Sequence, residues 1–277
     1  YFTGRESNIK KWINNPNFKI IRHDVIEPIE LEIDSIWHLA SPASPVHYKL
    51  NPIKTSKTIF LGTYNLLELS RKVGAKFLLA SSSEIYGDPE VDPQDENYKG
   101  SVNTTGIRSC YDEGKRIAET LCSDYKRMYE LDVKIMRIFN TYGPRMRSND
   151  GRVVSNFIFQ ALQEKSLTIY GDGSQTRSFC YVDDLIEGMV SLMNSNINTP
   201  INIGNPEEFK IIQLAKKIKD IINPNLDLIY KPLPEDDPSQ RRPDISKAKK
   251  YLQWQPKINF EKGINPTIDW FKNTYFL

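Results

Sequence analysis

Short apolar runs separated by segments of helical length constrain this chain most. Six runs have the length of a buried strand: Phe18–Ile21, Ser35–Ala40, Lys76–Ser81, Val133–Phe139, Leu167–Tyr170 and Ile201–Ile203. The segments Phe60–Val73 and Glu113–Tyr129 carry apolar residues close to the three-four spacing of an amphipathic helix. Apolar residues at consecutive strand positions are typical of a parallel sheet covered by helices on both faces. The alternation predicts an α/β fold with a doubly wound parallel sheet.

The pattern changes after about Gly143, where loops rich in Pro, Gly and Asp separate the apolar segments. Helical patterns continue at Val154–Gln163, Val182–Met193 and Gln213–Ile222. We expect residues 1–145, together with about 180–204, to form a Rossmann-like domain. Residues 146–179 and 205–277 would then form a smaller C-terminal lobe.

Composition excludes several classes of protein. The 37 basic and 35 acidic residues give a net charge of +2, so no polycationic face for nucleic acid is expected. No apolar run approaches the roughly 18 residues of a membrane span. Cys110, Cys122 and Cys180 lack the spacing of a metal site, and their odd number favours a reducing, cytoplasmic location.

The motif Tyr111-Asp112-Glu113-Gly114-Lys115 is the main candidate for chemistry. On a helix, positions i and i+4 share a face, and an ammonium near a phenol favours the phenolate, lowering a pKa that starts near ~10. Such a phenol can accept a proton, although isolated pairs of this kind occur in many helices. The run Ser82-Ser83-Glu84 follows an apolar strand, which predicts that it lies at the carboxyl edge of the sheet, where ligands bind.

With these motifs in place, the chain resembles the extended short-chain dehydrogenase/reductase superfamily, of the NAD-dependent epimerase/dehydratase type, and within it the UDP-glucuronic acid decarboxylase (UDP-xylose synthase) family. The resemblance runs nearly end to end. Its most specific stretches are His38–Pro45, Ser82–Pro89, Tyr111–Lys115, Arg137–Arg145, Asp150–Phe157, Gly173–Arg177 and Asp236–Asp244.

The resemblance implies NAD as the cofactor. By resemblance, the residues near it are Phe2, Thr3, Gly4, Asp24, Val25, Leu39, Ala40, Ser41, Thr58, Ala80, Tyr111, Lys115 and Thr141. The glycine-rich phosphate loop of the family is absent from this sequence, and Tyr1–Arg5 resembles the loop that follows the second strand. We therefore expect the first βαβ unit to lie upstream, and we expect residues 1–277 alone to bind NAD poorly, to be inactive and to aggregate.

The resemblance also implies a UDP-sugar substrate. Its expected contacts are Asn140, Arg152, Val153, Asn156, Thr168, Tyr170, Gln175, Arg177 and Arg241. Tyr111 would take the proton of the sugar C4 hydroxyl, oriented by Ser82, while hydride passes to NAD. The resulting ketone would lose carbon dioxide, with Ser83 and Arg241 stabilising the enolate and Glu84 assisting at C5. Return of the hydride would give UDP-xylose.

Two departures and two alternatives accompany this interpretation. Ser83 stands where related 4,6-dehydratases have an aspartate, which favours decarboxylation over dehydration, and Ile59 stands where relatives often have an asparagine. A 4,6-dehydratase or 4-epimerase is the alternative enzyme. A non-catalytic nucleotide-sugar-binding or dimerisation module is the alternative from another class. The family also implies a homodimer formed through the helices Phe60–Val73 and Glu113–Tyr129.

Overall fold

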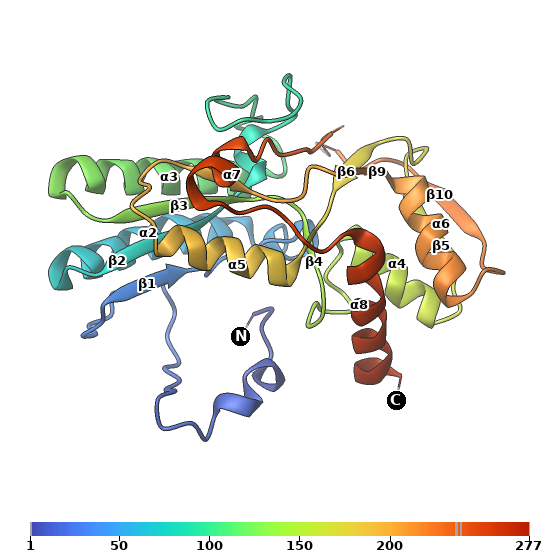
Figure 1. The fold of residues 1–277 in the computed structure, drawn as a ribbon, viewed down its shortest axis with the longest axis horizontal. Coiled ribbons are helices and arrows are strands. Elements are labelled where there is room, and N and C mark those ends of the chain that lie inside the picture. Colours follow the sequence, from blue (N-terminus) through green and yellow to red (C-terminus); the bar gives the residue numbers. More distant parts are fainter. Residues whose placement is uncertain (1, 236–237, 239, 277) are drawn as a thin grey trace.

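The structure is a computed structural model that describes residues 2–235, 238 and 240–276. At its centre lies a parallel sheet with the strand order β1-β2-β3-β8 (Figure 1). These strands are β1 (Ser35–His38), β2 (Lys76–Ser82), β3 (Val133–Ile138) and β8 (Ile201–Ile203). The predicted α/β fold with a parallel sheet is therefore confirmed, including the return of residues 201–203 to the main sheet.

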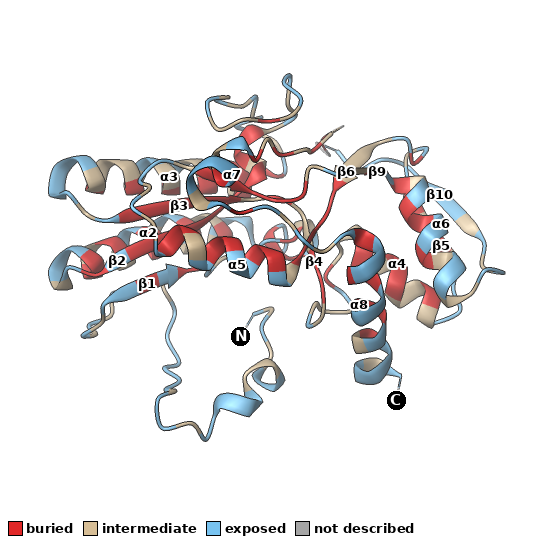
Figure 2. Cartoon of the chain, viewed as in Figure 1, coloured by how far each residue is buried: buried red, intermediate tan, exposed pale blue. Residues whose placement is uncertain are grey.

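Helices cover both faces of this sheet (Figure 1). On one face lie α2 (Pro52–Val73) and α3 (Ser109–Tyr129), and on the other lie α5 (Val182–Met193) and α7 (Ser246–Leu252). In β2, Phe77 and Leu79 join the core under α2 and α3, whereas Leu78 joins the core under α5. All three side chains are fully buried, and the central strands are largely red, the colour of buried residues, in Figure 2. Burial on both faces explains why this strand is apolar at consecutive positions.

Helices α2 and α3 both begin earlier than the apolar pattern predicts. The Asn51 side chain caps α2 by accepting a hydrogen bond from the Lys54 N–H (3.0 Å), and Pro52 occupies the first turn. The helix ends at Gly74, whose φ of 72° is left-handed. α3 begins at Ser109, so that the tyrosine of the central motif lies in its first turn.

The predicted strand at Phe18–Ile21 is wrong. This segment contains no strand, and Ile20 and Ile21 are exposed. A strand needs a neighbour to pair its backbone groups, and no other strand of the described chain pairs with these residues. The sheet instead ends at β1, where Trp37 and Leu39 are exposed. Before it, the helices and strands among the described residues are the short 3-10 helices η1 (Glu6–Asn8) and η2 (Lys10–Trp12).

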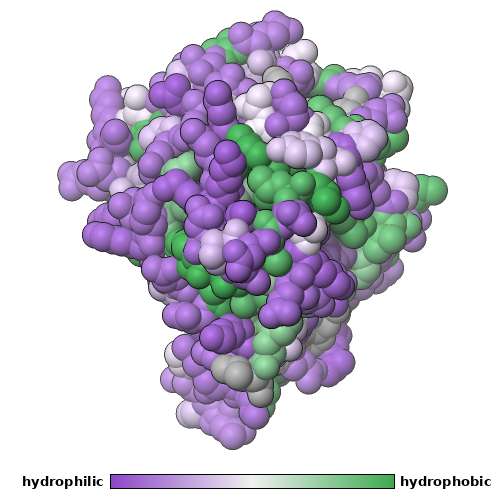
Figure 3. Space-filling model, turned by 90° about the vertical axis from the view of Figure 1, so that its right-hand side faces the viewer, coloured by the Kyte–Doolittle hydropathy of each residue, from purple (hydrophilic) through white to green (hydrophobic). Residues whose placement is uncertain are grey.

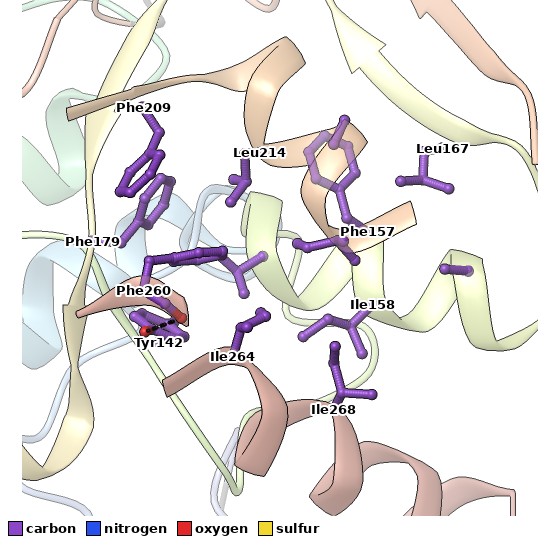
Figure 4. Packing of buried hydrophobic residues seen from close by; sticks show 14 of the residues in the cluster. Tyr142, Phe157, Ile158, Leu167, Phe179, Phe209, Leu214, Phe260, Ile264 and Ile268 are labelled. Atoms are coloured by element: carbon purple, nitrogen blue, oxygen red, sulfur yellow. Dashed lines mark hydrogen bonds between the residues drawn. The ribbon is translucent and has the colours of Figure 1, made fainter. Parts of the chain in front are cut away.

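Most of the elements outside the central sheet and its helices surround a second apolar core (Figure 4). They are β4 (Thr141–Tyr142), α4 (Val153–Leu162), β5 (Leu167–Tyr170), β6 (Thr176–Ser178), β7 (Cys180–Tyr181), β9 (Glu208–Lys210), α6 (Ile211–Ile222), β10 (Leu228–Lys231) and α8 (Phe260–Tyr275). Phe260 packs between Tyr142 and Phe209, and its carbonyl accepts a hydrogen bond from the Tyr142 hydroxyl (3.4 Å). The surface at this end of the molecule is largely hydrophilic, with patches of apolar residues (Figure 3).

Candidate active site

A cleft of about 790 Å³ lies between the carboxyl ends of the central strands and the second core. All six residues that the sequence suggests as catalytic line it: Ser82, Ser83, Glu84, Tyr111, Lys115 and Arg241. All nine suggested substrate contacts also line it: Asn140, Arg152, Val153, Asn156, Thr168, Tyr170, Gln175, Arg177 and Arg241. The fold thus brings together two groups of residues that lie far apart in the sequence.

Tyr111 and Lys115 lie one helical turn apart on the buried face of α3. Lys115 Nζ donates a hydrogen bond to Ala80 O (2.7 Å) and lies 5.6 Å from the centre of the Tyr111 ring. Burial raises the pKa of Tyr111 to about 12, although a hydrogen bond with Ser82 acts in the opposite direction. The predicted lowering of this pKa is therefore wrong for this arrangement, because desolvation of the phenolate outweighs the hydrogen bond with Ser82 and the positive charge of Arg152.

The stability of the protein should depend on pH through Lys115. Burial lowers the pKa of its ammonium from 10.5 to about 8. Between these two values the unfolded chain binds more protons than the folded one, so the free energy of unfolding should rise with pH by up to about 1.4 kcal/mol per unit. Thermal denaturation from pH 7 to pH 10 measures this rise relative to Lys115→Met. A difference between the two proteins that stays constant with pH would contradict it.

Tyr48, at the end of α1 (Pro45–Tyr48), stacks on Tyr111. The ring centres lie 5.0 Å apart and the ring planes differ by 9°. Tyr48 is almost fully buried, and its hydroxyl has no hydrogen-bond partner among the described residues. The stack fixes the plane of the Tyr111 ring. The sequence gives no local signal for Tyr48, since its partner is distant along the chain.

Glu84, on the 3-10 helix η3 (Ser83–Tyr86), lies between two arginines. Its Oε2 accepts hydrogen bonds from Arg108 Nη2 (2.6 Å) and Arg241 Nη2 (3.0 Å). Burial alone would raise the pKa of Glu84, but the positive charges of Arg241 and Arg108 outweigh it and hold the pKa below its usual value. Arg108 is a residue that the sequence reasoning missed. Its position three residues before Tyr111, at the N-cap of α3, is the signal that indicates it.

Gly87 ends η3 in a conformation that other residues rarely adopt, with φ 64°. A Cβ there would lie 1.7 Å from Ser101 O, and Gly87 O accepts a hydrogen bond from Arg241 Nη1 (2.7 Å). Gly74 has a similar φ, but no atom lies within 4 Å of the position of its Cβ.

Gly87→Ala should therefore destabilise the protein far more than Gly74→Ala, which should cost about 1–2 kcal/mol for its left-handed backbone. Urea denaturation of both variants measures the difference. An equal loss of unfolding free energy in the two variants would show that Ser101 moves aside without an energetic cost.

The substrate-side residues are held by local contacts. Arg152 Nε pairs with Asp150 Oδ2 (2.5 Å), and Gln175 Nε2 donates to Tyr170 O (2.6 Å). Arg177 Nη1 donates to Thr176 O (2.8 Å). Within the predicted motif of residues 236–244, Asp236, Asp237 and Ser239 lie outside the described residues.

The residues expected near the cofactor divide into two groups. Leu39, Ser41, Ala80, Tyr111, Lys115 and Thr141 line the cleft, whereas Phe2, Thr3, Gly4, Asp24, Val25, Ala40 and Thr58 do not. Asp24 pairs with Lys54 at the start of α2 (2.5 Å), and Val25 O accepts a hydrogen bond from Asn65 Nδ2 (3.1 Å) on the same helix. This second group therefore lies outside the cleft lining.

Ile59 is buried in the apolar core formed with α2 and α3, where its side chain makes no hydrogen bond.

In the part of the chain that the structure describes, no three His, Cys, Asp or Glu residues are arranged to hold a metal ion. No described helix has the length and apolarity needed to cross a membrane.

Comparison with known proteins identifies the family. A family model described as GDP-mannose 4,6 dehydratase matches residues 5–267. UDP-glucuronic acid decarboxylase 1 of Danio rerio is 56% identical over 271 residues, which are 98% of this chain and 65% of that protein. UDP-glucuronic acid decarboxylase 3 of Arabidopsis thaliana is 56% identical over 95% of this chain and 77% of its own length. The chain thus spans about two thirds of the length of the curated relatives that it matches.

A solved structure shares the fold. The UDP-glucuronic acid 4-epimerase of Bacillus cereus, in complex with UDP-glucuronic acid and NAD, superimposes with a TM-score of 0.88. It is 29% identical, and the match covers 97% of this chain and 86% of that one. On the combined evidence of sequence and fold, the chain belongs to the UDP-glucuronic acid decarboxylase family of epimerase/dehydratase proteins.

Proposed function

We propose that the protein converts UDP-glucuronate into UDP-xylose and carbon dioxide, with NAD as its cofactor. The observation that carries the proposal is the meeting of Tyr111, Ser82, Glu84 and Arg241 in one cleft. A phenolic base and an anion-binding arginine are the groups that oxidation at C4 and decarboxylation at C5 require. The names of the relatives that match almost the whole chain support the same reaction.

The residues at the strand ends fit a dinucleotide. Lys115 Nζ uses one donor for Ala80 O and retains others for ribose hydroxyls. Leu39 is half exposed in the cleft wall and offers apolar surface beside it. When bound, NAD supplies a reversible acceptor for the hydrogen at the sugar C4 carbon.

The chain's own residues handle protons and charge. Tyr111 accepts the proton of the C4 hydroxyl, which Ser82 orients, so that C4 can become a ketone. This ketone is β to the carboxylate, so the C5–C6 bond can break with its electron pair delocalised into an enolate. Ser83 and Arg241 stabilise the negative charge as it develops, and Glu84 organises the delivery of a proton to C5.

Product analysis tests the proposal against its alternatives. Full-length protein with NAD and UDP-glucuronate should release carbon dioxide and form UDP-xylose. Formation of UDP-galacturonate would indicate a 4-epimerase, which is the activity named for the Bacillus cereus structure. Conversion of dTDP-glucose to a 4-keto-6-deoxy sugar would indicate a dehydratase. Binding of UDP-sugars without turnover would indicate a non-catalytic module.

We further infer a division of labour between the two parts of the chain. Residues 1–145 and about 180–204 would hold the dinucleotide, and residues 146–179 and 205–277 would bind the nucleotide sugar. Within the second range, α7 packs on the central sheet with α5, which ties the two parts together. Cys110, Cys122 and Cys180 are free thiols, which supports a cytoplasmic location.

The protein should form a homodimer through the outer surface of α2 and α3. Phe60 and Tyr64 of α2 and Ile117 and Met128 of α3 are all exposed there, and apolar helix faces of this kind are typical of subunit interfaces. Ile117→Asp should yield a monomer in sedimentation velocity. Ile186→Asp, at an equally apolar exposed position on α5, is the matched control and should leave the dimer intact. A dimeric Ile117→Asp variant would place the interface elsewhere.

A further inference from the structure

Two loops that are distant in the sequence meet beside the cleft. The Gln94 N–H donates a hydrogen bond to Arg242 O (2.9 Å), and the Asp244 N–H donates one to Gln94 O (2.8 Å). These contacts form a short parallel bridge between Gln94 and Pro243. The second loop carries Arg241, whose own carbonyl accepts hydrogen bonds from the Ser178 N–H (3.2 Å) and hydroxyl (3.1 Å), so Gln94 and Ser178 together hold the backbone around that arginine.

The side chain of Gln94 strengthens this link. It is fully buried, and its Oε1 accepts a hydrogen bond from the Arg242 N–H (2.8 Å) while its Nε2 donates to Val91 O (2.7 Å). Burying an amide is costly unless its donor and acceptor are both paired, and here each has a partner. Gln94 therefore binds both backbone groups of Arg242, one with its main chain and one with its side chain.

The hydrogen bonds of the Arg241 guanidinium depend on where the loop held by Gln94 lies. The guanidinium is almost fully buried, with Nη1 bonded to Gly87 O (2.7 Å) and Nη2 bonded to Glu84 Oε2 (3.0 Å). Both of these acceptors follow β2, whereas Arg241 itself arrives on a loop more than 150 residues later. Gln94 does not line the cleft, so any effect that it has on a ligand is indirect, and Arg241, the neighbour of Arg242, does line it.

We propose that Gln94 is a positioning residue that holds Arg241 where its guanidinium binds the carboxylate of the sugar. This inference rests on the proposed function, in which Arg241 recognises the anionic end of UDP-glucuronate. If the Gln94 bridge is lost, Arg241 can withdraw from Glu84, and recognition of the carboxylate should weaken. Contacts with the uridine and diphosphate come from other residues and should persist.

Calorimetry with the full-length protein tests the proposal, with UDP-glucuronate, UDP-glucose and UDP as ligands. Gln94→Met removes both side-chain hydrogen bonds at similar volume, and Gln94→Asn is too short to reach Arg242 but remains polar. The matched control is Gln213→Met, because Gln213 Oε1 also accepts a backbone N–H, that of Lys210, on α6 outside the cleft.

We expect Gln94→Met and Gln94→Asn to bind UDP-glucuronate roughly 10-fold more weakly, as for loss of a hydrogen bond to a charged group, and to bind UDP and UDP-glucose normally. Gln213→Met should match the wild type. If Gln94→Met and Gln94→Asn both keep the wild-type preference for UDP-glucuronate, the positioning role of Gln94 is overturned and the proposed function is not. Equal weakening for all three ligands would show a merely structural role and would also overturn the positioning role. A wild type that does not prefer UDP-glucuronate over UDP-glucose would overturn the proposed function itself.

Discussion

Tyr111→Phe should lower the turnover of UDP-glucuronate by at least ~10²–10⁴-fold, the usual loss on removal of a general base. The Tyr111 hydroxyl is hydrogen-bonded with Ser82 in the cleft, and in the proposed mechanism it accepts the C4 proton. The folded structure should be retained, because the phenylalanine ring can keep the stack on Tyr48. Loss of rate without loss of stability is therefore the expected result.

Steady-state kinetics and thermal denaturation of the same preparation measure both effects. Tyr125→Phe is the matched control, since Tyr125 lies on the same helix but its hydroxyl bonds Glu68 outside the cleft. Its turnover should equal that of the wild type. A Tyr111→Phe variant with a near-normal rate would remove Tyr111 from the role of base.

Arg241→Ala should slow decarboxylation by roughly 10²–10³-fold, the range observed when a donor to a developing negative charge is removed. It should also weaken binding of UDP-glucuronate, because the guanidinium proposed to bind the substrate carboxylate is lost. Glu84 would lose the hydrogen bond from Arg241 and keep the one from Arg108. Arg241→Lys should recover little, because a single ammonium cannot bridge Gly87 O and Glu84 as the planar guanidinium does.

The neighbouring arginine provides the control for this prediction. The Arg242 side chain is partly exposed and lies near Asp92 (3.5 Å) and Glu208 (3.6 Å), away from the cleft lining. Arg242→Ala retains the backbone groups that Gln94 binds, so its kinetics should be close to those of the wild type. Equal defects in Arg241→Ala and Arg242→Ala would contradict a specific role for Arg241.

The sequence predicts the central fold well because the signals for it are local. Buried parallel strands such as β2 are apolar at consecutive positions, and the stripes of α2 and α3 follow helical spacing. The apolar run Phe18–Ile21, in contrast, forms no strand, because it has no strand to pair with in the described chain. Strand formation depends on a neighbour, and a local pattern cannot show whether one is present.

The sequence likewise predicts some features of the candidate site and not others. The spacing of Tyr111 and Lys115 correctly predicts a shared helical face. It does not predict the direction of the Tyr111 pKa, because that direction depends on burial, a property of the assembled fold. Tyr48 and Gln94 escape notice for the same reason, since their partners are distant in the sequence.

Isotope tracing tests the central claim most directly. UDP-glucuronate carrying ¹³C at C6 and deuterium at C4 should be converted by the full-length protein, with NAD, in ordinary water. The account predicts ¹³C in the released carbon dioxide, a UDP-xylose product that retains deuterium at C4, and a new hydrogen from solvent at C5. Retention of the ¹³C in the sugar product, or carbon dioxide release at an undiminished rate from Tyr111→Phe, would contradict it.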